Sequence, residues 1–374
     1  MKGYAILTLG FLVTMASCSE QRAPMALAQS EQVGRVEGLS VTESAESVQV
    51  EISKDIRSIF QDADGNYWFG SSDLGLYKYD RKKVVRYSTE NGLPSNRITN
   101  IQSDKSGTLF LNTGKGIGKF EDGKFTPIPV NKGKDGGNEW KLEKDDLWFA
   151  GRDAEGGVYR YDGESLHFLT FPKHKLHDEY FSQSPNRSYS PYDVYTIYKD
   201  KGGNMWFGTT NFGVCRFDGT SLNWLYEKHL TETPEGGSFG IRSVIEDKDG
   251  KFWICNTRYR FALDKSGFAP KSGEELKYSR EPGLKDDFGY FLSAVESDDG
   301  DLWMVGEFGV WRFGGKQIKK YPVKDGEDDA FVYAIYKDNV GGMWLSATAG
   351  RREVGAGLYR FNGEGFEKFV PSKS

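Results

Sequence analysis

The sequence predicts an all-β fold, a single seven-bladed β-propeller of four-stranded blades, and two observations carry this prediction. The first is a repeat, because a short strand with an aromatic anchor recurs along the chain, and most anchors have Gly three residues earlier. The anchors are Trp68, Phe110, Trp148, Trp206, Trp253, Trp303 and Trp344. The second is composition, since 14% of the 374 residues are aromatic and 46 are Gly, which favours short strands and tight turns. Units that repeat at such a period bury their apolar faces against one another, and seven of them suggest a closed ring.

Residues 1–18 are predicted to be a lipoprotein signal peptide. Lys2 supplies the positive start, and the apolar core at 5–15 is too short for a stable membrane span. Small residues then lead to Cys18, and Met15-Ala-Ser-Cys18 resembles a bacterial lipobox, so we expect cleavage before Cys18 and lipid attachment to it. Acyl chains contribute about 0.8 kcal/mol per buried CH₂, so a multiply acylated Cys would hold a soluble domain to a membrane. The alternative is a plain signal peptide with an incidental Cys.

Residues 19–50 are polar and small, without a hydrophobic period, and are predicted to be a flexible tether before the propeller at 51–374. The formal net charge of −5 is modest and mixed along the chain, without a basic stripe. Nucleic acid is therefore not an expected partner. Cys215 and Cys255 lie in strands of neighbouring repeats, and a disulfide would need their Cα atoms within about 7 Å, so two buried free thiols are favoured.

Each repeat is expected to supply four strands to one blade. The first strand has apolar residues twelve and nine positions before the anchor, such as Ile56 and Ile59. A turn follows, with Asp six and Gly three positions before the anchor, such as Asp62 and Gly65. Asp accepts backbone hydrogen bonds there and Gly adopts a positive φ. The anchor strand comes next, and a third and a fourth strand follow a Gly and a second turn.

Three repeats depart from this pattern. Repeat two has Phe110 as its anchor, repeat three has Leu142 and Asp145 where Asp and Gly are expected, and repeat six has Ser297 in place of Asp. The blade boundaries near residues 130–150 are therefore the least regular. Because the first repeat starts with its inner strand and the last ends with its outer one, we expect the ring to close without a shared strand. The alternative is that Val48 to Ile52 pairs with an edge.

An insertion at residues 171–192 precedes the fourth repeat and should lie in a loop on one face of the ring. Its His174, His177, Asp178 and Glu179 would suit zinc if the segment were helical, but a solvated loop is favoured because this spacing matches many loops.

Asp62 with Asp64, and Asp247 with Asp249, resemble the start of a calcium loop. A turn is favoured there, because the other repeats keep Asp and Gly without the middle Asp. We therefore assign neither a metal site nor a cofactor.

The stretch Glu90-Asn-Gly-Leu-Pro-Ser-Asn-Arg-Ile-Thr, followed by Asp104-x-x-Gly107, resembles the periplasmic repeats called two-component regulator propellers. The resemblance covers about residues 55–370. It implies β-propellers that serve as glycan-sensing input domains, often two in tandem ahead of a membrane span, a histidine kinase and a DNA-binding regulator. None of those later modules follows here, so we expect a stand-alone protein of the bacterial cell envelope, lipid-anchored and either periplasmic or on the cell surface.

Binding residues are expected at one end of the central channel, where the inner strands and the loops before them converge. The residue eleven positions before the anchor varies between repeats, as do the two residues before each inner strand. Aromatic rings with Arg and Asp suit sugars, whose C–H faces stack on aromatics while their hydroxyls bond fixed polar groups. The candidate ligand-binding residues are Arg57, Arg97, Asp193, Tyr195, Arg242 and Tyr333.

No Gly-x-Ser-x-Gly elbow, P-loop or His-Glu-x-x-His motif is present, so no catalytic residue is assigned. The sequence therefore predicts a non-catalytic, membrane-anchored, sensor-like propeller that binds a ligand at the channel mouth, with carbohydrate as the favoured class. One alternative is an exported propeller lyase or hydrolase, whose carboxylate pair would lie among the 54 acidic residues. Another is a protein-interaction scaffold in a cell-envelope complex, which would use loops such as 171–192.

Overall fold

The computed structural model describes most of the chain from residue 51 onward. The described residues are 51–131, 139–151, 156–185, 188–227, 230, 240–264, 271–284, 290–306, 309–315, 317–348 and 356–371. They all belong to one compact unit, Gly38–Ser374. The predicted signal peptide at 1–18, its Cys18 and the tether at 19–50 lie outside the described residues.

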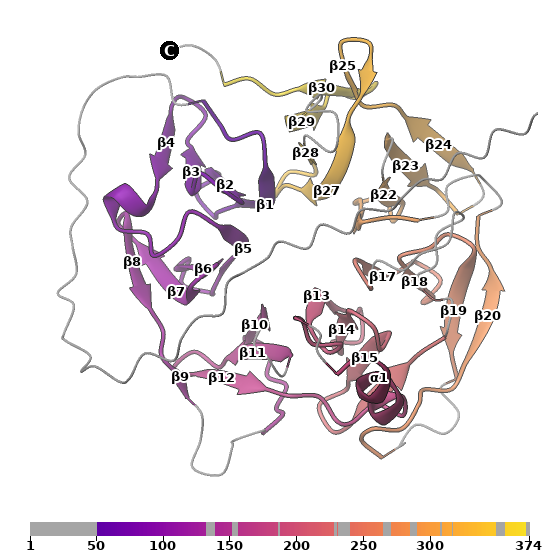
Figure 1. Ribbon diagram of the computed structural model, residues 1–374. Coiled ribbons are helices and arrows are strands. Elements are labelled where there is room, and N and C mark those ends of the chain that lie inside the picture. The colour runs from indigo at the N-terminus through magenta and orange to yellow at the C-terminus, as the bar shows by residue number, and fades with distance from the viewer. Residues whose placement is uncertain are drawn as a thin grey trace, which may run out of the picture. The chain divides into compact units, whose positions relative to one another are not determined.

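Seven four-stranded sheets form a ring, which confirms the predicted seven-bladed propeller (Figure 1). Blade one contains β1 (Ile56–Gln61), β2 (Tyr67–Ser71), β3 (Leu76–Tyr79) and β4 (Val84–Tyr87). Blade two contains β5 (Ile98–Ser103), β6 (Leu109–Thr113), β7 (Gly116–Glu121) and β8 (Lys124–Pro127). Blade three contains β9 (Val130–Asn131), β10 (Leu147–Gly151), β11 (Gly157–Tyr161) and β12 (Leu166–Leu169). Blade four contains β13 (Val194–Lys199), β14 (Met205–Thr209), β15 (Val214–Phe217) and β16 (Leu222–Leu225). Blade five contains β17 (Val244–Glu246), β18 (Phe252–Ile254), β19 (Tyr259–Leu263) and β20 (Tyr278–Pro282). Blade six contains β21 (Ser293–Glu296), β22 (Leu302–Gly306), β23 (Gly309–Phe313) and β24 (Ile318–Tyr321). Blade seven contains β27 (Phe331–Lys337), β28 (Met343–Thr348), β29 (Gly357–Phe361) and β30 (Phe366–Lys368). The other described elements are the short 3-10 helix η1 (Thr89–Asn91), the helix α1 (His177–Gln183) and the hairpin β25 (Lys324–Asp325) with β26 (Asp328–Asp329).

The last blade closes onto the first through side chains. The inner strand β1 packs against β27 and β28 of blade seven. Beside it, the Tyr67 hydroxyl of blade one donates to the Asp338 carboxylate of blade seven at 2.7 Å. Among the described residues, blades seven and one share no strand, as predicted.

In four repeats the Asp six positions before the Trp anchor has a second role beside its turn. In the first repeat Asp62 Oδ1 accepts the Asn66 N–H at 2.8 Å, and Gly65 has a φ of 81°. The other oxygen, Oδ2, accepts the indole N–H of Trp68 at 2.8 Å. Further Asp–Trp bonds of the same kind join Asp200 to Trp206, Asp247 to Trp253 and Asp338 to Trp344. In these turns the carboxylate ties the hairpin to the anchor ring, which accounts for Asp62 and Asp247 without calcium.

The anchors are buried between blades, and most carry a cation on one face. Trp68 of blade one, for example, packs with residues of blade two such as Leu109 and Phe120, and is 5% exposed. Lys78 lies directly across the sheet from Trp68, with its ammonium 5.2 Å from the ring centroid. Four other anchors are covered by a cation in the same way. The pairs are Lys119 over Phe110, Arg260 over Trp253, Arg312 over Trp303 and Arg360 over Trp344. The repeated residues are therefore scaffold.

Blade three departs from the predicted strand order. Its sheet runs β10-β11-β12-β9, so the anchor strand β10 is the first strand of the sheet, and β9 adds to the outer edge in parallel. No strand before β10 takes the inner position among the described residues. The Trp148 carbonyl instead accepts the side-chain N–H of Gln102 at 2.7 Å, and the Ala150 carbonyl accepts that of Asn112 at 3.1 Å, both from blade two. The reason is local, because this repeat lacks the Asp and Gly that close the hairpin elsewhere.

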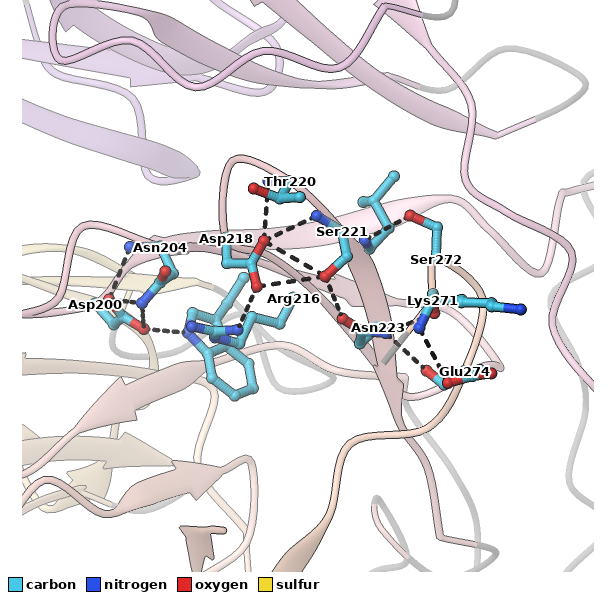
Figure 2. A network of polar contacts seen from close by, with 12 residues as sticks. Asp200, Asn204, Arg216, Asp218, Thr220, Ser221, Asn223, Lys271, Ser272 and Glu274 are labelled. Atoms are coloured by element: carbon cyan, nitrogen blue, oxygen red, sulfur yellow. Dashed lines mark hydrogen bonds and ion pairs between the residues drawn. The ribbon is translucent and has the colours of Figure 1, made fainter. Parts of the chain in front are cut away.

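The outer edge of blade four is covered by a segment of blade five (Figure 2). The Asn223 side chain on β16 donates to the carbonyls of Lys271 and Glu274, at 3.0 and 3.3 Å. The Leu222 N–H donates to the hydroxyl of Ser272 at 3.1 Å. The Ser221 hydroxyl, in the turn before β16, donates to the side-chain oxygen of Asn223. An edge strand satisfied in this way is not open to pairing with another chain.

The insertion at residues 171–192 is not a simple solvated loop as expected, because its described part contains a helix and is buried near both ends, although no residue of the helix itself is buried. It contains α1, and His174 just before the helix is 1% exposed, with its ring stacked on Phe212 at 4.6 Å. Burial lowers the pKa of His174 to about 4. His177 Nδ1 lies 2.9 Å from the hydroxyl of Tyr192, which is also buried. His174 and Tyr192 therefore fix the two ends of the insertion to blade four, through their contacts with Phe212.

The side chains weighed as zinc ligands engage separate partners. His174 Nδ1 accepts the Leu176 N–H at 3.2 Å, and Asp178 pairs with Lys173 at 2.7 Å. Within the described ranges, no group of three or more His, Cys, Asp or Glu side chains is placed to hold a metal ion.

Cys215 and Cys255 are buried free thiols, as predicted. Burial raises the pKa of Cys255 to about 12, and its Sγ accepts the backbone N–H groups of Arg242 and Ser243 at 2.7 and 3.0 Å. No helix in the described part of the chain is long and apolar enough to cross a membrane.

Candidate functional site

The residue eleven positions before the anchor has a special backbone setting. In β1 the register to β2 shifts between Ile56 and Ser58, so Arg57 is the bulged residue. The same shift falls at the equivalent residue of three further inner strands, namely Thr99, Tyr195 and Tyr333. A bulge takes a side chain out of the regular alternation of the strand and is frequent beside functional sites. The position that varies between repeats is thus also the position where the inner strand is distorted.

These residues lie on the strands nearest the middle of the ring. Figure 1 shows β1, β5, β13, β17 and β27 towards the middle of the ring, with β4, β8, β20 and β24 at its periphery. Arg242 and Leu292 occupy the equivalent positions of blades five and six, shortly before β17 and β21. We call the described side chains at this position the rim.

At the seam between blades seven and one, the rim holds an Arg stacked on a Tyr. The Arg57 Cζ lies 4.5 Å from the centroid of the Tyr333 ring. The edge of the same guanidinium faces the Asp55 carboxylate: Nε lies 2.8 Å from Oδ1 in an ion pair, and Nη2 donates to Oδ2 at 3.0 Å. The Ser72 hydroxyl also donates to that carboxylate. The side chains of Arg57 and Asp55 remain 31% and 32% exposed, so this arrangement is open to solvent.

The seam between blades four and five holds a second stack. The Arg242 Cζ lies 3.6 Å from the centroid of the Tyr195 ring. Gly240 allows this packing, because a Cβ there would be 2.7 Å from Tyr195 Cε2 and 2.9 Å from the Thr210 carbonyl oxygen. Its φ of 69° also favours glycine. A side chain larger than hydrogen at this residue would displace the ring.

The two seams share further chemistry. In each, the Tyr comes from one blade and the Arg from the next, at equivalent positions of their repeats. Deeper in each seam a second Tyr accepts a backbone N–H of the following blade. The Tyr198 hydroxyl accepts that of Glu246 at 3.1 Å, and the Tyr336 hydroxyl accepts that of Gln61 at 2.8 Å. The seams seven/one and four/five are therefore equivalent in both their rim and their deeper contacts.

The structure thus brings together four of the six predicted binding residues in two pairs. Arg97 and Asp193 lie two positions earlier in their repeats, directly before β5 and β13. Arg97 is exposed and its side chain runs beside Gly114, whereas Asp193 is half-buried and its carbonyl accepts the Thr210 N–H at 2.9 Å.

Asp55 was missed by the sequence prediction. It directly precedes the inner strand of its blade, as Arg97 and Asp193 do in theirs, and this shared position was the signal that could have identified it.

Residues 51–73 and 188–211 match the two component regulator propeller family. The matched segments cover the inner strand and the anchor strand of blades one and four, including Arg57 and Tyr195. These two segments therefore resemble two-component regulator propeller repeats, as predicted. No curated protein is significantly similar to it.

Several solved structures share the fold. The extracellular domain of the one-component system BT4673 from B. thetaiotaomicron matches with a TM-score of 0.54 and 17% identity, over 83% of this chain and 38% of that chain. YCF48 from Cyanidioschyzon merolae matches with a TM-score of 0.53 and 13% identity, over 82% of this chain and 95% of that one. A streptogramin B lyase matches with a TM-score of 0.51 and 13% identity, over 83% and 93% of the two chains. The chain spans less than two fifths of the BT4673 domain, and at these identities the likeness concerns the fold alone.

Proposed function

We propose that this protein is a non-catalytic, sensor-like propeller that binds a carbohydrate at the mouth of its channel. The observation that carries the proposal is the presence of two Arg–Tyr stacks on the rim, at bulged or adjoining positions of the inner strands. These are the positions that vary between repeats that otherwise keep the same scaffold.

The chemistry of the stacks suits a sugar. The faces of an aromatic ring and of a guanidinium are flat and weakly hydrated, so the C–H face of a pyranose can lie against them. The N–H edges of the guanidinium then donate to hydroxyl or carboxylate oxygens. Because Arg57 is already held by Tyr333 and Asp55, little side-chain freedom is lost when a ligand binds.

The comparisons support a sensor role. The repeats are of the two-component regulator type, and the BT4673 domain is described as the extracellular part of a one-component or hybrid two-component system. A propeller that binds without reacting fits such an input role. The lyase similarity does not favour catalysis here, because at 13% identity it concerns only the fold.

We further propose that the protein is exported and anchored to the cell envelope by lipid on Cys18, facing the periplasm or the cell surface. The support is the signal-like segment at 1–18 and its lipobox-like end. Metabolic labelling with an alkyne fatty acid tests this directly. The protein should be labelled and the Cys18→Ala variant should not, whereas equal labelling of both would contradict the anchor.

The binding proposal is tested on a glycan array with the full-length protein in detergent, alongside Arg57→Ala and Arg242→Ala. Both variants should lose most of the signal for the glycan that the wild type binds. Arg360→Ala is the matched control, because it removes a guanidinium stacked on the scaffold ring of Trp344 at 5.2 Å, outside the rim. If the wild type binds no glycan at high protein concentration, the proposal fails, and capture of an envelope protein in its place would favour the scaffold alternative.

A further inference from the structure

The two Arg–Tyr stacks lie almost opposite each other. In a ring of seven blades, the seam between blades four and five is three blades away from the seam between blades seven and one in one direction, and four blades away in the other. The middle of the ring therefore lies between the stacks. We call them the Arg57 stack and the Arg242 stack.

The remaining rim positions are of a different kind. Of the six described residues eleven positions before an anchor, four form the stacks, and the other two are Thr99 and Leu292. Neither has a flat face, and the Thr99 hydroxyl is already bonded to the Asn112 carbonyl at 3.1 Å. The described rim thus carries Arg–Tyr stacks at two separate places rather than a continuous aromatic belt.

From this arrangement we infer that the two stacks are the halves of one site, and that the ligand is a linear oligosaccharide that spans the channel mouth and contacts both. The inference rests on the proposed carbohydrate binding and specifies its substrate class. A single sugar unit would contact one stack only, so its affinity would be that of one half-site.

The two halves are similar but not identical. At the Arg57 stack the residue before the inner strand is Asp55, which clamps the guanidinium edge. At the Arg242 stack the equivalent residue is Gly240, over which the Tyr195 ring packs. An oligosaccharide has two different ends, so a site with two different halves would bind it in one direction.

The affinity gain from such a site follows from the linkage of its halves. Once one end of the chain is bound, the other end binds as an intramolecular step, at an effective concentration in the millimolar range for short flexible links. An oligosaccharide long enough to reach both stacks should bind roughly 100- to 10,000-fold more tightly than one that reaches a single stack.

Isothermal titration of the full-length protein in detergent tests the inference. The probes are xylan, arabinan and polygalacturonan oligosaccharides of two, four, six and eight units, and the variants are Tyr195→Ala, Tyr333→Ala and the double variant. We expect one molecule bound per chain, and a rise in affinity at the length that reaches both stacks. Each single variant should abolish that rise. Arg360→Ala should retain it, and Arg242→Gln and Arg57→Gln replace any Tyr variant whose thermal unfolding shows that it has not folded.

Two outcomes overturn the inference while leaving carbohydrate binding in place. One is binding of two molecules per chain, with each Tyr variant removing one site and leaving the other unchanged. The other is a length-independent affinity, or an affinity insensitive to one of the two stacks. If none of the probe series binds to the wild type, both the inference and the proposed function are contradicted.

Discussion

Replacing Asp338 by Ala should destabilise the propeller far more than its place in a turn suggests. Asp338 is 3% exposed, and its Oδ2 accepts the indole N–H of Trp344 at 3.0 Å and the Tyr67 hydroxyl of blade one at 2.7 Å. Both donors are themselves buried, at 1% and 4% exposure. A buried donor left without an acceptor costs about 1–3 kcal/mol, so the two together should lower the free energy of unfolding by about 2–6 kcal/mol.

The matched control is Asp104→Ala. Asp104 holds the same turn through the backbone N–H groups of Ser106 and Thr108, but the anchor of its repeat is Phe110, which has no indole N–H. This variant should lose only turn bonds, at about 0.5–1.5 kcal/mol each. Urea unfolding followed by tryptophan fluorescence measures both. Equal losses in the two variants would refute a role for the indole and phenol bonds.

The pH dependence provides a second measure of Asp338. Desolvation by burial raises its pKa, but the bonds from Tyr67 and Trp344 and from turn N–H groups outweigh this, so the pKa lies below its usual value. A carboxyl with a lowered folded-state pKa contributes stability that is present above its unfolded pKa of about 3.9. That stability is lost as the pH falls through the folded pKa. Below about pH 4 the wild type should therefore lose its advantage over Asp338→Ala.

Three further predictions concern other parts of the ring. His174, with a pKa lowered to about 4 by burial, binds a proton more readily in the unfolded chain. Acidification from pH 7 to pH 4 should thus cost about 3 kcal/mol of stability through this residue, and His174→Phe should flatten the profile of unfolding free energy against pH. Gly240→Ala should lower the melting temperature and weaken glycan binding, because its Cβ would meet the Tyr195 ring. Gly107→Ala, with a φ of 86° but nothing within 4 Å, should show only the backbone cost of about 1–2 kcal/mol and unchanged binding. Gln102→Leu should leave the Trp148 carbonyl without its amide donor and cost about 1–3 kcal/mol in urea unfolding, and a cost below about 0.5 kcal/mol would mean that this carbonyl is satisfied by water.

Most of the fold could be predicted because each blade is encoded by a short sequence pattern that repeats along the chain. Asp62, Gly65 and Trp68 lie within seven residues of one another, and their spacing recurs with the strand pattern around it. Blade three could not be predicted, since Leu142 and Asp145 remove the turn chemistry on which the assignment of an inner strand depends. What replaces that chemistry comes from side chains of blade two, and no pattern within the third repeat reports them.

The site was predictable only in part for a related reason. Arg57 and Tyr195 stand out because they vary where the scaffold repeats. Their partners are not deducible in this way, because Tyr333 lies at the other end of the chain from Arg57 and meets it only when the ring closes. The burial of His174 was missed because it depends on Phe212, which belongs to a different turn of blade four.

The closure of the ring also determines how it would respond to a pulling force. A ring sealed by strand exchange opens only when a ladder of main-chain hydrogen bonds breaks at once. Here the described seam between blades seven and one is made of side chains, such as the Tyr336 hydroxyl on the Gln61 N–H and the Tyr67 hydroxyl on Asp338. The strand next to that seam, β1, is also the first described strand after residues 19–50. Tension applied through the N-terminal segment of an anchored protein would therefore load this seam first, and would part its side-chain contacts one at a time.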